Sequence, residues 1–336
     1  MKESAGVILK AVDLDIGYAK KSGNRVVQRN IRAELYRGEL TCIIGPNGVG
    51  KSTLLRTLSG VQRPLAGSVL LNGVDLFSYN RQKLAREVSL TLTGGSAGNL
   101  TVFELIALGR YPHTDWTGRL KPDDEEKIRT AIEAVHCEPI LQQKLHELSD
   151  GQIQKAMIAR ALAQDGDLMI MDEPSAHLDL NNKIEIMILL QKLASEHRKA
   201  ILVATHELDL ALQTADRLWL VSFDRPLVAG IPESLALSGA LSGIFKSKTY
   251  SFDLKTGRIK IFQQGGREVS LEGSGREYFW TQHALERSGI AVGENSAVRV
   301  AIKDGRWSLT TTSGIWECPS LEDLLNRIRN LPAIKD

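Results

Sequence analysis

The chain has 336 residues, which is enough for one large domain and a smaller second one. Hydrophobic residues make up 43% of it, enough for a sizeable core, and the net charge of +2 provides no strong field for nucleic acid or a membrane surface. No apolar run is long enough to span a bilayer, and the first ten residues, MKESAGVILK, lack the apolar core of a signal peptide. The three cysteines are widely spaced and the seven histidines are scattered, so the sequence predicts neither a disulfide framework nor a metal site with cysteine or histidine ligands. We therefore expect a cytosolic protein without a nucleic-acid partner.

The first forty residues have the pattern of short strands and turns, with strand-like stretches at 7–9, 14–16 and 31–36. Tyr18 follows a glycine directly after the second stretch. An aromatic ring here can stack on an adenine base, an interaction that contributes roughly 1–3 kcal/mol. A half-buried strand residue is the alternative, because aromatic residues are common in strands.

Residues 40–53 contain an apolar strand-like run, a glycine-rich turn with the pattern G-x-x-x-x-G-K-S, and the start of a helical pattern. Strand, loop and helix in this order are the context that a phosphate-binding loop requires. Glycines let several N–H groups point at one anion, and the helix start adds its positive dipole end. We expect Lys51 to reach the β- and γ-phosphates and Ser52 to offer its hydroxyl to Mg²⁺. The residues expected to contact nucleotide here are Gly45, Pro46, Asn47, Gly48, Val49, Gly50, Lys51, Ser52 and Thr53.

A helical block follows a further short strand at 88–93 and a turn-rich break. Thr101-x-x-Glu104 has the pattern of a capping box, and apolar residues between 128 and 135 recur at helical spacing. We interpret the region of about 94–147 as a helical insertion in an α/β core.

The stretch LSDGQ at 148–152 stands directly before another helical run. Ser149, Gly151 and Gln152 can present a hydroxyl and backbone donors to an anion at that helix start. The alternative is an ordinary helix cap. Because the chain already has one phosphate loop, an anion site here requires a second nucleotide or a second subunit.

Two strand ends carry further chemistry. The apolar run at 168–171 is followed by Asp172, a candidate Mg²⁺ ligand, and Glu173, a candidate general base for an attacking water. His206 ends the apolar run that begins at residue 200 and can hydrogen-bond a γ-phosphate. Solvated acids and a structural histidine are the alternatives at these positions.

Roughly residues 7–260 resemble the nucleotide-binding subunit of ATP-binding cassette (ABC) transporters, with one aromatic residue and then five motifs in the family's order. The matches are Tyr18 with the adenine-stacking aromatic, 45–52 with Walker A, 148–152 with the signature, 168–173 with Walker B and its catalytic glutamate, 175–179 with the D-loop that ends at Asp179, and His206 with the switch histidine. Within the family, residues 101–113 are similar to the group that serves importers of ferric siderophores, haem and vitamin B12.

The sequence departs from the family pattern at two positions. Thr93 stands where the family has a glutamine near the Mg²⁺ and the attacking water, and a threonine would reach them only through another water. Asp150 stands where the signature usually has glycine, which is tolerable because an acid at a helix start is electrostatically favourable.

The resemblance implies an α/β fold with a P-loop NTPase core, an antiparallel β subdomain and the helical insertion. It also implies hydrolysis of ATP to ADP and phosphate, with Mg²⁺ on Ser52 and Asp172 and two copies of the chain sandwiching the nucleotide. Signature residues and Asp179 of one copy would face the Walker A loop of the other. A separate integral-membrane permease, an extracytoplasmic substrate-binding protein and a peripheral place on the cytoplasmic face of the cell's inner membrane follow from the same resemblance.

The C-terminal part extends beyond the minimal cassette. Residues 263–275 are glycine-rich and are interpreted as a linker with one short strand, and 276–336 as a small α+β domain. That domain either only packs on the core or dimer partner, or it regulates or stabilises the dimer. For the whole chain, a soluble ABC ATPase unconnected with transport and a nucleotide-binding module without turnover are the alternatives.

Overall fold

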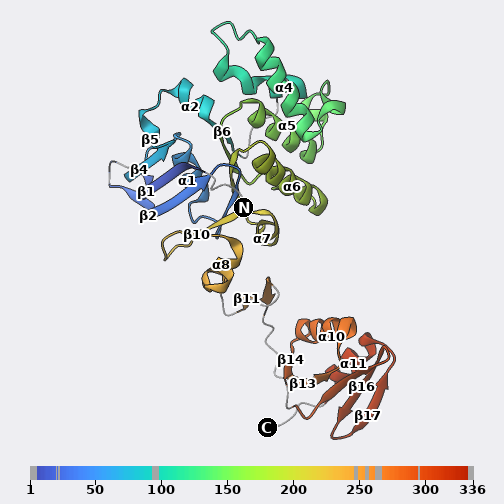
Figure 1. The fold of residues 1–336 in the computed structure, drawn as a ribbon. Helices are drawn as coiled ribbons and strands as arrows, with labels where there is room; N and C mark the ends of the chain where they lie inside the picture. Colours follow the sequence, from blue (N-terminus) through green and yellow to red (C-terminus); the bar gives the residue numbers. More distant parts are fainter. Residues whose placement is uncertain are drawn as a thin grey trace. The chain divides into compact units, whose positions relative to one another are not determined.

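The structure is a computed structural model that describes residues 6–19, 21, 23–92, 98–245, 249–253, 257–261, 267–293 and 296–331 (Figure 1). The chain divides into two compact units, Met1–Ile244 and Phe245–Asp336. No helix among the described residues is both long and apolar enough to cross a bilayer.

The first unit begins with an antiparallel sheet in the order β2-β1-β4-β5. Its strands are β1 (Val7–Tyr18), β2 (Arg25–Tyr36), β4 (Ala66–Leu71) and β5 (Val74–Asp75), and the short helix η1 (Leu76–Ser78) follows. The separate strands predicted at 7–9 and 14–16 are one strand. The register with β2 shifts between Ala11 and Leu14, where Asp13 has a φ of 46°, so the chain passes an irregularity without leaving the sheet.

The second sheet has the order β10-β9-β3-β8-β7-β6, and all strand pairs except β9–β10 are parallel. Its strands are β3 (Leu40–Ile44), β6 (Val88–Thr91), β7 (Leu168–Asp172), β8 (Ala200–Ala204), β9 (Arg217–Leu220) and β10 (Val228–Gly230). Every residue of β3, β7 and β8 is buried, as their unbroken apolar runs predict for strands covered on both faces. Because these three strands are parallel neighbours, the segments that follow them emerge at one edge of the sheet.

Helices connect and cover the strands of this sheet. They are α1 (Lys51–Leu58), α2 (Arg81–Glu87), α6 (Leu180–Glu196), α7 (Leu208–Thr214), α8 (Pro232–Leu237) and α9 (Ala240–Ile244). One apolar core extends across the β1 and β3 sheets, with Trp219 as its largest fully buried side chain.

The predicted helical insertion is a layer of helices, visible in green in Figure 1. It contains α3 (Val102–Ala107), η2 (Leu108–His113), α4 (Pro122–Val135), η3 (Glu138–Ile140), η4 (Leu145–Glu147) and, packed on α3 and α4, α5 (Asp150–Ala163). The predicted capping box is confirmed, since Thr101 Oγ1 accepts from the N–H of Glu104 at 3.1 Å and the Glu104 carboxylate accepts from the N–H of Thr101 at 2.7 Å. The apolar residues predicted for the buried face of α4 are buried.

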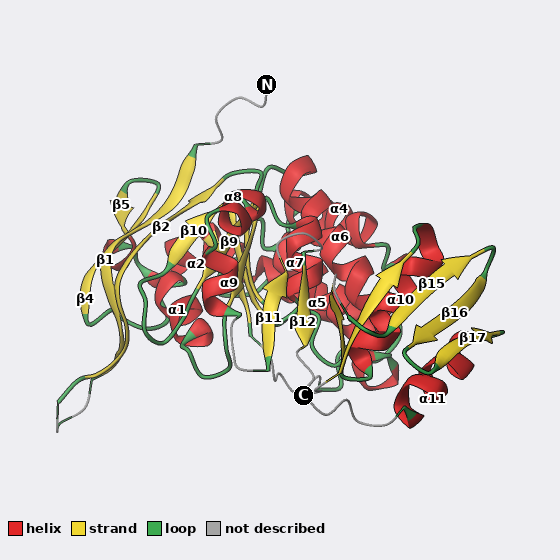
Figure 2. Cartoon of the chain, turned by 90° about the horizontal axis from the view of Figure 1, so that it is seen from below, coloured by secondary structure: helices red, strands yellow, loops and turns green. Residues whose placement is uncertain are grey.

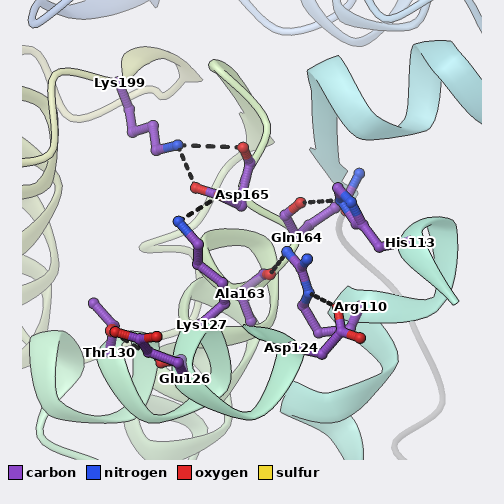
Figure 3. Close-up of polar contacts among 10 residues, drawn as sticks. All are labelled: Arg110, His113, Asp124, Glu126, Lys127, Thr130, Ala163, Gln164, Asp165 and Lys199. Carbon is purple, nitrogen blue, oxygen red and sulfur yellow. Dashed lines mark hydrogen bonds and ion pairs between the residues drawn. The ribbon is translucent and has the colours of Figure 1, made fainter. Parts of the chain in front are cut away.

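A polar hub joins this helical layer to the main sheet (Figure 3). Arg110 of η2 donates to Asp124 of α4 and to the carbonyl of Ala163, both at 2.9 Å, and the two charged side chains are only 3% and 4% exposed. Asp165, just after α5, binds Lys127 of α4 and Lys199 before β8, again at 2.9 Å. The hub therefore fixes the C-terminal end of α5 with paired charges.

The second unit contains a hairpin and a five-stranded sheet in the order β14-β13-β15-β16-β17, whose last three strands lie side by side in Figure 2. The elements are β11 (Tyr250–Asp253), β12 (Arg258–Ile261), β13 (Arg267–Glu272), α10 (Gly275–Arg287), β14 (Ile290–Gly293), β15 (Arg299–Lys303), β16 (Arg306–Thr311), β17 (Gly314–Cys318) and α11 (Leu321–Asn330). The Asp304–Gly305 turn joins β15 to β16 with positive φ at both residues, and the Ser320 hydroxyl caps α11.

The stretch interpreted as a linker at 263–275 is corrected in part. Its described portion includes β13, which is hydrogen-bonded on both sides, to β14 and to β15, and therefore lies inside the sheet. Val269 of β13 is buried in the apolar core of this unit. The strand belongs to the second domain, and residues 262–266 lie outside the described part of the chain.

Candidate functional site

The loop between β3 and α1 has the geometry of an anion cradle. Gly48 and Gly50 have φ values of 77° and 110°, in the left-handed region that favours glycine. Gly50 is the N-cap of α1, where no side chain caps the helix and no acid stands in the first turn. The first N–H groups of α1 are therefore left for a ligand, and the helix dipole favours a negative one.

Close packing on two sides fixes this loop. A Cβ atom at Gly45 would lie 2.3 Å from the carbonyl oxygen of Val221, and one at Gly50 would lie 2.3 Å from a methyl group of Val27. Neither distance is tolerable, so only glycine fits at both positions. The loop is thus held between the end of β9 and strand β2.

Lys51 lies over the loop with its charge unpaired. Its Nζ donates to the carbonyls of Gly45 at 2.8 Å and Pro46 at 3.3 Å, and it forms no ion pair within 4.0 Å among the described residues. Burial lowers the pKa of Lys51, although the nearby charges of Glu173 and Asp172 oppose that shift. An ammonium held only by carbonyl groups is well suited to exchange them for phosphate oxygens.

The ends of β7 and β8 bring the acidic and imidazole groups together. Asp172 ends β7 and is buried, and the N–H of Glu173 donates to the carbonyl of Ala204 at 2.8 Å. This bond ties the turn after β7, where Glu173 has a φ of 49°, to the end of β8. The Nδ1 atom of His206 lies 3.5 Å from the Glu173 carboxylate, so both groups face the same edge of the sheet.

Glu207 and Lys183 are additions that sequence reasoning missed. Glu207 binds His206 Nε2 at 3.2 Å and Lys183 Nζ at 2.5 Å. The only sequence signal was an acid directly after the histidine. The pair connects the His206 ring to α6.

Tyr18 is the last residue of β1 and is 40% exposed. Its hydroxyl lies 3.0 Å from Thr53 Oγ1 in the first turn of α1. The ring is therefore held next to the phosphate loop with a large part of its surface open.

The signature stretch forms the start of α5. Ser149 Oγ accepts from the N–H of Gln152 at 3.3 Å, and the Gln152 side chain accepts from the N–H of Ser149 at 3.0 Å. A Cβ atom at Gly151 would lie 2.8 Å from Asn182, whose N–H donates to Asp179, the N-cap of α6, at 2.8 Å. The structure thus brings the signature and the D-loop together, and no hydrogen bond or ion pair in the described residues joins them to the phosphate loop.

Thr93 lies outside the described residues, two positions after the end of β6. No group of three or more histidine, cysteine or acidic side chains forms a metal site in the described part of the chain. A cation near Ser52 and Asp172 would therefore need ligands from elsewhere, as Mg²⁺ takes from phosphates and water.

Comparisons with known proteins give a consistent result. A family model described as "ABC transporter" matches residues 28–176, and one described as "Iron ABC transporter C-terminal domain" matches 266–329. An uncharacterised ABC transporter ATP-binding protein of Methanocaldococcus jannaschii is 41% identical over 261 residues, which are 75% of this chain and 89% of the relative. The ferric enterobactin transport ATP-binding protein FepC of Escherichia coli is 35% identical over 238 residues, 70% of this chain and 86% of FepC. Among solved structures, cbiO1 of Clostridium perfringens, part of the ABC transporter complex cbiONQ, superimposes with a TM-score of 0.60 at 28% identity and covers 69% of this chain and 91% of its own.

Proposed function

This chain belongs to the ABC transporter family of ATP-binding proteins, and we propose on that basis that it is the ATP-hydrolysing subunit of an importer for an iron–siderophore, haem or cobalamin cargo. The assignment to iron transport depends on one observation. The same chain matches both the ABC transporter family model and the model of the iron ABC transporter C-terminal domain. Relatives named for siderophore transport support the same cargo class.

The nucleotide lies in the cradle between β3 and α1. Lys51 leaves the carbonyls of Gly45 and Pro46 for the phosphates, the N–H groups of the loop hold the remaining oxygens, and Tyr18 stacks on the adenine. Mg²⁺ fits Ser52 and Asp172 together with phosphate oxygens and water, and when bound it neutralises charge that develops on the phosphates.

Hydrolysis uses the groups at the ends of β7 and β8. The Glu173 carboxylate orients the attacking water and accepts its proton, and His206 donates a hydrogen bond to the γ-phosphate. Their 3.5 Å separation supports a shared task at one point of the sheet edge.

Two copies of the chain complete the site. The exposed hydroxyl of Ser149, the start of α5 at Gly151 and Gln152, and Asp179 contact the nucleotide held by the partner copy. Support comes from their mutual packing through Asn182 and their separation from the chain's own phosphate loop.

A separate permease docks on the helical layer, so that the chain is peripheral on the cytoplasmic face of the membrane. Phe103, Leu108, Tyr111 and Trp116 are exposed there, and a surface this rich in large apolar side chains is typical of an interface. An extracytoplasmic substrate-binding protein completes the import system.

The second domain regulates or stabilises the dimer. On α10, Phe279, Trp280 and His283 form an exposed ring group with centroid distances of 5.4 Å and 5.6 Å between neighbours. A chain truncated after Ile244 keeps the first compact unit whole. Loss of dimerisation or altered ATPase activity in that truncation supports this role, and no change in either assigns the domain to packing alone.

The substitution Glu173→Gln tests the catalytic assignment. It preserves the size of the side chain but removes the base, so we expect MgATP binding and dimerisation to persist while turnover falls by about 10²–10⁴-fold. Glu185→Gln, at an exposed acid of α6 that pairs with Lys155, is the control and should leave turnover unchanged. Wild-type turnover in Glu173→Gln would remove the assignment.

Copurification with a multi-span membrane protein, and stimulation of turnover by it, separates the importer from a soluble ABC ATPase.

A further inference from the structure

Gln28 of β2 is a buried amide with two unusual partners. The residue is 6% exposed, and its Nε2 donates to the carbonyl of Val49 at 3.1 Å and to the carbonyl of Ser222 at 2.7 Å. One NH₂ group has two hydrogens, so both are used. The reverse orientation of the amide would put its oxygen against two carbonyl oxygens, and the two acceptors therefore fix the orientation.

These partners belong to different parts of the first unit. Val49 is in the phosphate loop, Ser222 follows β9, and Gln28 is in the antiparallel sheet, so a single side chain ties three segments that are far apart in sequence. The residues next to Gln28 and Ser222 also contact the phosphate loop, since Val27 packs on Gly50 and Val221 packs on Gly45.

The bond to Val49 has a consequence for the anion cradle. Val49 C=O and Gly50 N–H belong to one planar trans peptide, in which the two groups point in opposite directions. A hydrogen bond that holds the carbonyl toward Gln28 therefore turns the N–H of Gly50 away from Gln28. If that N–H binds phosphate, as the proposed function requires, its orientation is set before any ligand arrives, which reduces the ordering needed on binding.

We propose that Gln28 is a positioning residue of the phosphate loop, which holds the Val49–Gly50 peptide in its phosphate-binding orientation by bridging Val49 to Ser222. The proposal rests on the proposed function, because it requires that the loop bind a nucleotide phosphate. Gln28 touches neither nucleotide nor the attacking water, and it acts through the backbone.

The test uses Gln28→Met, which keeps the length and volume of the side chain but has no donor. Gln164→Met is a matched control, since Gln164 Nε2 also bridges two carbonyls, those of Ala85 and Val88 at 2.6 Å and 2.9 Å, away from the phosphate loop. Both variants of the full chain are titrated with MgADP by calorimetry and assayed for ATP turnover. Thermal unfolding of both is followed in parallel.

We expect Gln28→Met to weaken MgADP binding about tenfold, the size expected from one or two net hydrogen bonds. The KM for ATP should rise similarly, while kcat at saturating ATP changes less than about twofold because the bound phosphate itself restores the loop. Gln164→Met should lose comparable thermal stability with unchanged MgADP affinity. Gln28→Asn, one methylene shorter, should reach only one carbonyl and give an intermediate loss, and it carries the test if Gln28→Met does not fold.

Wild-type MgADP affinity in Gln28→Met, or equal effects of Gln28→Met and Gln164→Met on affinity, overturns the role of Gln28. Failure of the unmodified chain to bind MgADP overturns the proposed function instead. The two failures are therefore distinguishable in one set of titrations.

Discussion

Two regions of the first unit are rich in buried polar groups, and they differ in how charge is balanced. In the hub of Figure 3, Arg110 meets Asp124, and Asp165 meets Lys127 and Lys199. At the phosphate loop, the Lys51 ammonium meets only carbonyl groups, and burial lowers its pKa. The fold thus stabilises the charges of the hub and disfavours the charge of Lys51, and that difference distinguishes the structural hub from the proposed phosphate-binding site.

The strongest test of this difference replaces one lysine in each region by methionine. Lys51→Met removes a cation that the fold does not pair, so we expect kcat/KM for ATP to fall by about 10³-fold or more with little change in the free energy of unfolding. Lys199→Met removes a cation that pairs with Asp165 and should show the opposite pattern, reduced stability with retained nucleotide affinity. An assay of ATP turnover gives kcat/KM, calorimetric titration with MgATP gives the nucleotide affinity, and urea unfolding gives the free energy of unfolding. Loss of stability in Lys51→Met equal to that of Lys199→Met would contradict the distinction.

The ion pair of the hub gives the next largest effect. Arg110→Met leaves Asp124 buried without its partner, and we expect unfolding to become easier by roughly 3–5 kcal/mol. Arg110→Met combined with Asp124→Leu removes both charges, so much of that loss should return. Chemical denaturation of both variants and the parent checks this. A double variant less stable than the single one would contradict the expectation, because Asp124 would then stabilise the fold even without Arg110, through the bond that it accepts from the N–H of Lys121.

The paired carboxylates of the hub should also make the stability of the fold sensitive to acid. Burial alone would raise the pKa of Asp124 and Asp165, but hydrogen-bond donors to the two carboxylates lower it by more. These are the N–H of Lys121 and Arg110 for Asp124, and Lys199 and Lys127 for Asp165, and both pKa values fall below the ordinary 3.8. A carboxyl whose pKa is lowered by folding contributes stability that is complete above its unfolded pKa and is lost as pH falls through its folded pKa.

We therefore expect the free energy of unfolding to decrease as the pH falls below about 4, with part of that decrease due to the hub. Asp165→Asn should be less stable than the parent at neutral pH, and the difference should narrow on acidification. Urea unfolding at a series of pH values measures both. A difference that is constant with pH would show that the pKa of Asp165 does not change on folding.

The sequence was most informative where function depends on local order. The phosphate loop, Asp172, Glu173 and His206 each follow an apolar run, and parallel strands deliver their ends to one edge, so the shared edge was predictable. Arg110 and Gln28 were not predictable as buried, because a polar residue in a short helix or an edge strand is ordinarily solvated. Their acceptors, at Ala163 and Ser222, are distant in sequence.

The boundary of the second domain shows the same limit. The stretch at 263–275 has a glycine-rich composition that favours a linker, and its short strand was recognised. Whether such a strand stands alone or joins a sheet depends on partners, and β14 and β15 follow only after α10. Pairing between distant segments is information that local composition does not contain.

Tyr18 gives the smallest expected effect. Two substitutions there compare the bond of its hydroxyl to Thr53 with the proposed contact of its ring with the nucleotide base. Tyr18→Phe keeps the ring and loses only the hydroxyl bond to Thr53, so we expect MgATP affinity to weaken by about 0.5–1.5 kcal/mol or less. Tyr18→Ala also removes the ring on which we propose that adenine stacks, and an additional loss of roughly 1–3 kcal/mol should follow. Titration with MgATP and with MgGTP separates stacking from base-specific hydrogen bonding, because a ring face accepts either purine. If Tyr18→Ala binds MgATP no more weakly than Tyr18→Phe, the ring does not contact the base, and the tyrosine then serves only to tie the end of β1 to the first turn of α1.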